Sequence, residues 1–172
     1  MKTEILLSGS GGQGIITTAI IYAKAAVLFN KEVIHSQSYG PEARGGTSKS
    51  EIIISDNRIY HPHVINPKYM LCFTQQAVNK YSSLLDYSGI LIIDSSLVQN
   101  YENNMTTIAV PFLKLTLEYF KKSLFMNMVA LGYLTKVIRE IPYKYVEIAV
   151  QDSVPKNFIN INLQALKLGY NI

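Results

Sequence analysis

The chain has 172 residues, of which 48% are hydrophobic and only 16% charged, and its 16 Lys and Arg against 12 Asp and Glu give a net charge of +4. This length suits one well-buried core and is too short for two ordinary domains, so we expect a single domain over residues 1–172. The positive charge is small and scattered along the sequence. Nucleic acid is therefore excluded as a leading partner.

The only cysteine, Cys72, allows no internal disulfide and cannot by itself ligate an iron–sulfur cluster, which takes about four thiolates. It lies in the apolar run Tyr69–Phe73, where an inert core thiol is favoured over a nucleophile. The first residues lack the pattern of a secretory signal, and no stretch approaches the roughly 20 apolar residues of a membrane span. We therefore expect a soluble, cytoplasmic protein with no membrane association.

Short apolar runs alternate with longer segments of helical character. Strands are predicted at Glu4–Ser8, Val33–Gln37, Ser48–Ser55, Tyr69–Phe73, Ile90–Asp94 and Thr106–Val110, with a possible hairpin return at Arg58–Tyr60. Helices are predicted at Gln13–Phe29, Gln75–Leu85, Ser123–Arg139, Tyr143–Asp152 and Lys156–Leu168, with Gly169 as a helix stop and everything beyond Phe112 helical. The first two strands and the helix between them form a β-α-β unit, which needs a crossover of this length. The expected fold is Rossmann-like α/β, a mostly parallel sheet flanked by helices with a helical C-terminal part.

A glycine-rich loop, Gly9-Ser10-Gly11-Gly12-Gln13-Gly14, joins the first predicted strand to the first predicted helix. Its Gly-x-Gly-x-x-Gly spacing allows close approach of the backbone to a ligand, and the helix N-terminus offers unpaired N–H groups to an anion. A dinucleotide site would also need a carboxylate at the end of the second strand, where the sequence has Ile34-His35-Ser36-Gln37. A Walker A loop is excluded because Ile15 follows Gly14 in place of Lys.

A tight strand–helix turn that binds nothing would also use these glycines. The spare Gly12 and Gln13 favour a ligand, because Gly12 removes side-chain cover while Gln13 offers an amide that both donates and accepts hydrogen bonds. We therefore place Gly9, Gly11, Gly12, Gln13 and Gly14 in a cofactor-binding loop.

A second polar segment follows the second predicted strand, at the sheet edge where ligands bind in open parallel sheets. Its candidate residues, expected to form a wall of a substrate or active site, are Tyr39, Gly40, Pro41, Glu42, Arg44, Gly45, Gly46 and Thr47. The guanidinium of Arg44 suits bidentate binding of a carboxylate or phosphate, although a solvated Glu–Arg pair is the commoner role for such residues.

Taken in this order, the two loops and the strand Ser-Glu-Ile-Ile-Ile-Ser-Asp that follows them resemble the gamma subunit of 2-oxoacid:ferredoxin oxidoreductases, of the 2-oxoglutarate and branched-chain types. This group lies within the pyruvate/ketoisovalerate oxidoreductase catalytic-domain family. The resemblance extends to Asn127–Gly132 and Asn162–Leu166, so it covers nearly the whole chain.

The resemblance implies a subunit of an enzyme that oxidatively decarboxylates a 2-oxoacid, with 2-oxoglutarate favoured, to an acyl-coenzyme A and passes electrons to ferredoxin. Coenzyme A would occupy a shared site beside the glycine-rich loop. Thiamine diphosphate, Mg and iron–sulfur clusters are expected on alpha and beta partner subunits, with a ferredoxin-like delta subunit as a further candidate, and the chain is not expected to be active alone. No catalytic residue is assigned to this chain.

Two other functions remain alternatives. One is a stand-alone nucleotide- or coenzyme A-binding module outside any complex. The other is a nicotinamide dehydrogenase, which is disfavoured because the second predicted strand does not end in a carboxylate. His35, His61 and His63 are too scattered to predict a metal site, and Asp94 is assigned to helix capping before ligand contact.

Overall fold

The computed structural model describes residues 1–38, 46–101 and 106–172. Its strands are β1 (Lys2–Ser10), β2 (Glu32–Ser38), β3 (Thr47–Ser55), β4 (Tyr69–Cys72), β5 (Ile90–Asp94) and β6 (Thr106–Val110). Its α-helices are α1 (Ile15–Leu28), α2 (Gln75–Tyr81), α3 (Phe112–Phe120), α4 (Met126–Ile138), α5 (Tyr143–Gln151) and α6 (Ile159–Asn171), with 3-10 helices η1 (Ser82–Leu84), η2 (Ser123–Phe125) and η3 (Lys156–Phe158). Within the described ranges, no helix is both long enough and apolar enough to cross a membrane.

The six strands form one mixed sheet in the order β2-β3-β1-β4-β5-β6. The pairs β1–β4, β4–β5 and β5–β6 are parallel, whereas β3 is antiparallel to both of its neighbours, β1 and β2. Five strands therefore run in one direction and β3 runs against them. All six predicted strands are present, and the expected α/β architecture is confirmed.

The predicted β-α-β unit is split, because β1 and β2 are not neighbours and β3 lies between them. The connection from Ser38 to Thr47 is too short for the crossover of a dozen or more residues that parallel neighbours require, so β3 can pair with β2 only as an antiparallel partner. The insertion brings the end of β1 beside the start of β3, with Ser10 opposite Thr47.

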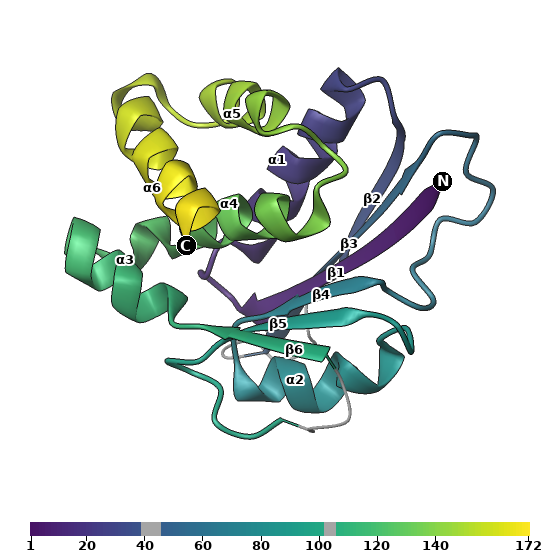
Figure 1. Ribbon diagram of the computed structural model, residues 1–172, viewed down its shortest axis with the longest axis horizontal. Coiled ribbons are helices and arrows are strands. Elements are labelled where there is room, and N and C mark those ends of the chain that lie inside the picture. Colours follow the sequence, from purple (N-terminus) through teal and green to yellow (C-terminus); the bar gives the residue numbers. More distant parts are fainter. Residues whose placement is uncertain (39–45, 102–105) are drawn as a thin grey trace.

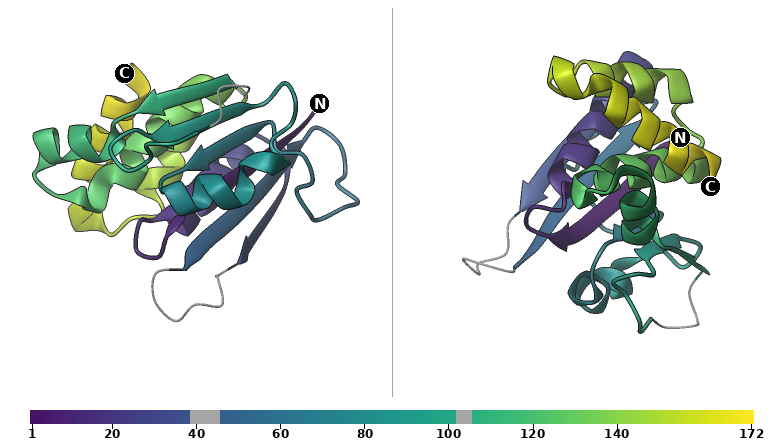
Figure 2. Two further views of the ribbon diagram at one scale, coloured as in Figure 1. Left: turned by 90° about the horizontal axis from the view of Figure 1, so that it is seen from below. Right: turned by 90° about the vertical axis from the view of Figure 1, so that its left-hand side faces the viewer.

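Helices cover the two faces of the sheet unequally (Figures 1 and 2). Helices α1, α4, α5 and α6 form a thick layer on one face, and α2 covers the other. Successive residues of β1 pack against opposite helical layers: Ile5 and Leu7 belong to the larger hydrophobic cluster, and Leu6 belongs to the smaller one under α2. A strand buried on both faces has a continuous apolar sequence, as β1, β4 and β5 do.

Two predicted details are wrong. Arg58, Ile59 and Tyr60 form no strand, because β1 and β2 already occupy both edges of β3 up to its last residue, Ser55. Gly169 is also not a helix stop, since α6 continues to Asn171.

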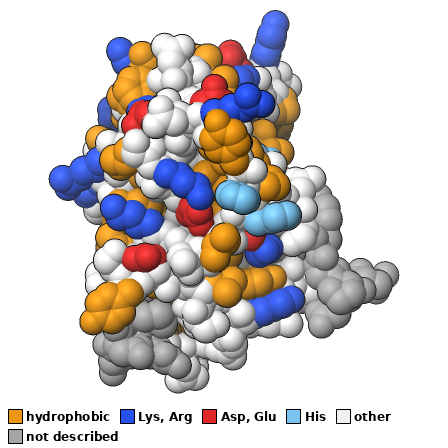
Figure 3. Space-filling view, turned by 90° about the vertical axis from the view of Figure 1, so that its right-hand side faces the viewer, with side chains coloured by type: hydrophobic (Ala, Val, Ile, Leu, Met, Phe, Trp, Pro, Cys, Tyr) orange, Lys and Arg blue, Asp and Glu red, His pale blue; other side chains and the backbone are white. Residues whose placement is uncertain are grey.

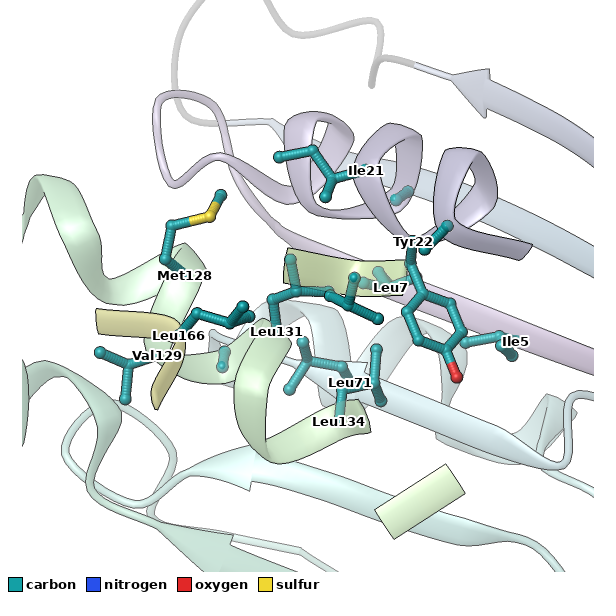
Figure 4. Packing of buried hydrophobic residues seen from close by; sticks show 14 of the residues in the cluster. Ile5, Leu7, Ile21, Tyr22, Leu71, Met128, Val129, Leu131, Leu134 and Leu166 are labelled. Carbon is teal, nitrogen blue, oxygen red and sulfur yellow. The ribbon is translucent and has the colours of Figure 1, made fainter. Parts of the chain in front are cut away.

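Gly169 instead marks a close contact between two helices. A Cβ atom at Gly169 would lie 1.7 Å from the carbonyl oxygen of Val129, and a Cβ atom at Gly132 would lie 2.0 Å from that of Leu166. Both obstacles are backbone atoms, so α4 and α6 approach one another more closely than any residue with a side chain would allow. Figure 4 shows Val129, Leu131 and Leu166 among the packed residues of the larger cluster.

Candidate functional site

The glycine-rich loop makes the turn between the end of β1 and the start of α1. Gly12 and Gly14 have φ angles of 85° and 74°, in the left-handed region that residues with a Cβ atom rarely adopt. Gly14 is the residue that caps the N-terminus of α1, and among the described residues no side chain caps the helix there. The glycines at these two positions are therefore required by the turn itself.

The first turn of α1 exposes backbone donors. The first backbone bond of the helix runs from the Thr18 N–H to the Gly14 carbonyl oxygen, at 2.9 Å. The N–H groups of Ile15, Ile16 and Thr17 consequently have no partner inside the helix. No acidic side chain lies in this turn, so the positive end of the helix dipole is not neutralised locally. The arrangement is suited to an anion.

Gln13 folds back onto the loop. Its Oε1 atom accepts a hydrogen bond from the Ser10 N–H at 2.7 Å, and its own N–H donates to the Ser10 carbonyl oxygen at 3.2 Å. A Cβ atom at Gly9 would lie 2.6 Å from Gln13 Oε1, so Gly9 leaves the space that the amide occupies. The amide oxygen of Gln13 therefore stabilises the turn, whereas the sequence predicted that this amide contacts a ligand.

A pocket of about 520 Å³ opens in front of this loop. It is lined by the loop and first turn of α1 together with residues from β3 and from the starts of α4 and α6: Ser10, Gly11, Gly12, Gly14, Ile15, Ile16, Thr17, Ser48, Leu124, Phe125, Asn127, Met128, Val154, Pro155, Phe158 and Asn162. Three of the five predicted loop residues, Gly11, Gly12 and Gly14, line it directly. Gly9 and Gln13 lie behind them and shape the turn.

Three helices begin at this pocket. Besides α1, these are α4, which continues from η2, and α6, which continues from η3. The Met126 N–H is already paired with the Ser123 carbonyl oxygen and the Ile159 N–H with the Lys156 carbonyl oxygen, so the unpaired donors of the pocket come from α1. The remaining lining is largely apolar, so the pocket suits a ligand that joins an anionic group to a less polar body.

Two asparagines supply polar side chains in the pocket. Asn127 packs directly on the loop, because a Cβ atom at Gly14 would lie 2.5 Å from Asn127 Nδ2. Its Oδ1 accepts from the Met128 N–H at 3.0 Å, while Asn162 Nδ2 donates to the Phe158 carbonyl oxygen at 2.8 Å. The sequence had not predicted either residue as part of the site. The available signal was an asparagine near the start of each of these two largely apolar helices.

The second predicted segment adjoins the first. Tyr39, Gly40, Pro41, Glu42, Arg44 and Gly45 lie outside the described residues, and their role stays a prediction. Gly46 is half-buried, and Thr47 is buried, with its Oγ1 accepting from Lys80 Nζ at 3.4 Å. Because Ser10 pairs with Thr47, this segment and the glycine-rich loop leave the same edge of the sheet. Ser48, the next residue, lines the pocket.

Asp94 is a helix cap, as predicted, but it caps a helix distant in sequence. Its Oδ2 accepts from the Leu113 N–H at 3.0 Å, in the first turn of α3, and its Oδ1 accepts from the Ser96 N–H at 2.8 Å. Burial raises the pKa of this carboxyl, and the two N–H donors oppose that shift. Cys72 is fully buried, and burial raises the pKa of its thiol to about 12, which confirms an inert core thiol.

The histidines take no part in the pocket. His61 and His63 are exposed, and half-buried His35 places its Nε2 2.7 Å from Ser50 Oγ. Within the described residues, no group of three or more His, Cys, Asp or Glu is placed to hold a metal ion. On the face in Figure 3, basic and acidic side chains are interspersed around the histidines.

The comparison with known families decides the assignment. The family model described as pyruvate ferredoxin/flavodoxin oxidoreductase matches residues 4–172. The chain belongs to this family. A curated member, the 2-oxoglutarate synthase subunit KorC of Methanocaldococcus jannaschii, is 43% identical over 100% of this chain and 94% of its own length. The KorC subunit of Archaeoglobus fulgidus is 36% identical over 99% of this chain and 88% of its own.

Solved structures of other proteins share the fold. The gamma subunit of a keto/oxoacid ferredoxin oxidoreductase from Geobacter sulfurreducens is 37% identical, with a TM-score of 0.87 over 98% of this chain and 96% of that one. The 2-oxoglutarate:ferredoxin oxidoreductase of Magnetococcus marinus, solved with 2-oxoglutarate, coenzyme A and succinyl-CoA, is 20% identical with a TM-score of 0.88. It is matched over 99% of this chain but 30% of its own, so there the same fold forms one part of a longer polypeptide.

Proposed function

We propose that this chain is the gamma subunit of a 2-oxoacid:ferredoxin oxidoreductase, specifically a 2-oxoglutarate synthase. The enzyme would convert 2-oxoglutarate and coenzyme A to succinyl-CoA and carbon dioxide, with ferredoxin accepting the electrons. The observation that carries the proposal is the match to KorC from end to end, at 43% identity. The whole chain, residues 1–172, would act as one gamma-type domain in a cytoplasmic hetero-oligomer.

Within that enzyme, the pocket beside the glycine-rich loop would bind coenzyme A. The diphosphate of coenzyme A is a compact anion, and the unpaired N–H groups of Ile15, Ile16 and Thr17 suit it. The rest of the pocket is largely apolar and contains the amides of Asn127 and Asn162, so it suits the flexible arm of coenzyme A, which carries amide groups. The residues from Tyr39 to Thr47 would form the adjoining wall of the active site.

Thiamine diphosphate, its Mg ion and the iron–sulfur clusters would belong to the alpha and beta subunits, and to a ferredoxin-like delta subunit where one is present. The whole sequence contains one cysteine, which cannot ligate a cluster, and Cys72 is buried in the sheet. This chain would therefore supply binding and positioning, and would be inactive without its partners.

Substitution of Gly11 tests the assignment of the loop. Gly11 lines the pocket, its φ angle is not in the left-handed region, and an added Cβ atom would meet nothing within 4 Å, so a side chain fits without strain. Gly11→Asp adds a negative charge near the proposed diphosphate, and Gly11→Asn adds the same shape without the charge. At about 5 Å and an effective dielectric constant of about 40, the repulsion is about 1.7 kcal/mol per unit charge.

We expect Gly11→Asp to raise the KM for coenzyme A at least tenfold in the assembled complex, with the KM for 2-oxoglutarate unchanged. The matched Gly11→Asn variant should change the KM for coenzyme A by much less, and both variants should assemble normally. If the two variants have the same KM for coenzyme A, the loop does not interact with the charge of the ligand, and the coenzyme A assignment is wrong.

Native purification tests the larger assignment. The chain should copurify with subunits that bind thiamine diphosphate and iron–sulfur clusters. The complex should then reduce ferredoxin or a dye in a coenzyme A-dependent assay with 2-oxoglutarate in preference to pyruvate and branched-chain 2-oxoacids. A stable monomer that binds ligand without such partners would instead support a stand-alone binding module.

A further inference from the structure

The outward face of α1 is apolar, although it faces solvent. Eight residues of this helix are buried against the rest of the fold, and the others form its outward face: Ile16, Thr17, Ile20, Lys24, Val27 and Leu28. Ile20 is 46% exposed, Val27 57% and Leu28 38%. A surface helix usually carries charged and polar residues on this side, and a helix that is apolar all round is normally buried. The sequence of α1 therefore fits a helix that is covered on every side.

The outward residues form one continuous surface, here called the α1 stripe. Ile16, Ile20, Lys24 and Val27 are spaced four, four and three residues apart, which places them along one side of a helix. Lys24 is the only charged residue in the sequence of α1, and its Nζ lies 3.4 Å from Asp152 Oδ2 at the end of α5. The one charge on the stripe is therefore paired within this chain. Contiguous exposed apolar surface is typical of a site of contact with another protein.

The α1 stripe continues into the pocket. Ile16 and Thr17, at its N-terminal end, line the pocket beside the glycine-rich loop. Leu124 and Phe158, which are 67% and 46% exposed, add further apolar side chains to the lining from η2 and η3. The right-hand view of Figure 2 shows α1, in purple, at the margin of the helical layer. Exposed apolar surface thus extends from the pocket along α1 to its C-terminal end.

We propose that the α1 stripe docks against the partner subunit that holds thiamine diphosphate, through an apolar and uncharged surface of that subunit. The inference rests on the proposed function, in which thiamine diphosphate lies on another subunit, coenzyme A lies in the pocket of this one, and both take part in one reaction. The subunit that holds thiamine diphosphate must therefore approach the pocket, and the stripe is the apolar surface that continues from it. Interfaces of permanent complexes are rich in apolar surface and poor in charge at their centre.

A second copy of this chain is a poorer occupant of the stripe. It would cover the edge of both pockets with chains that hold no thiamine diphosphate, and so would obstruct the approach of the subunit that does. In the Magnetococcus marinus enzyme, the same fold accounts for 30% of one polypeptide, so there it is covalently joined to other parts of the enzyme. Contact with a different part of the same enzyme is therefore the arrangement that the fold has in that relative.

Substitutions on the stripe test the docking face in the complex. Ile20→Glu and Val27→Glu each place a carboxylate on the stripe but outside the pocket, and glutamate has a higher helix propensity than isoleucine or valine, so both variants should fold. Leu84→Glu is the matched control, because Leu84 is 41% exposed and lies in η1, which follows α2 on the other face of the sheet. The measurement is the dissociation constant of each purified chain for the purified thiamine- and cluster-bearing subunits, with urea unfolding of each chain as the check on folding.

We expect Ile20→Glu and Val27→Glu each to raise this dissociation constant about tenfold or more, because a carboxylate buried against an apolar surface has no partner. Leu84→Glu should change it less than about twofold. For the wild-type chain, the dissociation constant should be no larger in about 1 M NaCl than in about 0.1 M NaCl, because salt screens only charged contacts.

The docking face is wrong if the wild-type chain binds these subunits and both stripe variants bind them equally well. It is also wrong if the isolated wild-type chain forms a dimer that Ile20→Glu dissociates while binding to the other subunits is unchanged, since the stripe would then belong to a second copy. Failure of the wild-type chain itself to bind these subunits would overturn the proposed function together with the docking face, and this result is distinguished from the others because it needs no substitution.

Discussion

Replacing Gly169 by alanine perturbs the contact between α4 and α6 most directly. In an exposed helix interior, Gly→Ala stabilises a protein by about 1 kcal/mol, because alanine has the higher helix propensity. Here the new Cβ atom would lie 1.7 Å from the Val129 carbonyl oxygen, whereas real Cβ atoms essentially never lie within 3.0 Å of another heavy atom. The helices must therefore separate by about 1.3 Å or more at this point.

The cost of that separation outweighs the gain in propensity. Overpacking of a well-packed core costs about 1–3 kcal/mol, and the obstacle here is backbone that no rotamer change can move aside. Because the obstacle is backbone, we take the upper end of that range, about 3 kcal/mol, and subtracting the gain of about 1 kcal/mol in propensity leaves a net loss of about 2 kcal/mol. For a chain of this length that corresponds to a fall in Tm of about 4–8 °C. Gly132→Ala, which meets the Leu166 carbonyl oxygen at 2.0 Å, should behave alike.

Urea and thermal unfolding of the purified chain measure this prediction. Gly11→Ala is the control, because its Cβ atom would meet nothing within 4 Å, and its stability should stay within about 0.5 kcal/mol of wild type. In the assembled complex, Gly169→Ala should also weaken coenzyme A binding, since α4 and α6 both line the pocket at their N-termini. A Gly169→Ala variant as stable as wild type, or more stable, would refute the close backbone contact.

Two further predictions follow from the buried polar groups of the sheet. The Cys72 thiol has a pKa of about 12 in the folded chain against an ordinary 9.0, so above pH 9 the thiol ionises first in the unfolded state and the folded state loses stability. In urea unfolding, the difference in the free energy of unfolding between wild type and Cys72→Ala should therefore shrink by about 1.4 kcal/mol between pH 8 and 10. An unchanged difference would contradict the burial of the thiol. Asp94→Ala leaves the N–H groups of Leu113 and Ser96 without their acceptor and should cost about 1–3 kcal/mol in thermal or urea unfolding. Glu118→Ala, which removes an exposed carboxylate from α3, is the control and should change little.

The sequence predicted the strands and the loop because those features are local. Each of the six strands contains a short apolar run, and these runs are longest in β4 and β5, where both faces of the sheet are covered. The glycine-rich loop was recognisable because left-handed backbone at Gly12 and Gly14 selects glycine directly. The family assignment rested on those same local motifs.

The order of the strands was not local. Whether β2 pairs with β1 or with β3 depends on the length of the connection and on which edges are free, and this decided both the split β-α-β unit and the absence of a hairpin strand at Arg58–Tyr60. The same applies to Gly169, which has the sequence pattern of a helix stop and serves as a point of contact between helices. Its role depends on Val129, forty positions away.

The two walls of the pocket differ in whether the sequence alone or the tertiary structure determines them. Its glycine-rich wall was determined by the sequence alone, since a tight turn and an uncapped helix N-terminus are properties of a few adjacent residues. Its opposite wall, with Asn127, Phe158 and Asn162, exists only because α4 and α6 begin beside α1. That convergence is decided by tertiary packing, through the glycine contact that brings α4 and α6 together, and no pattern within any one segment specifies it.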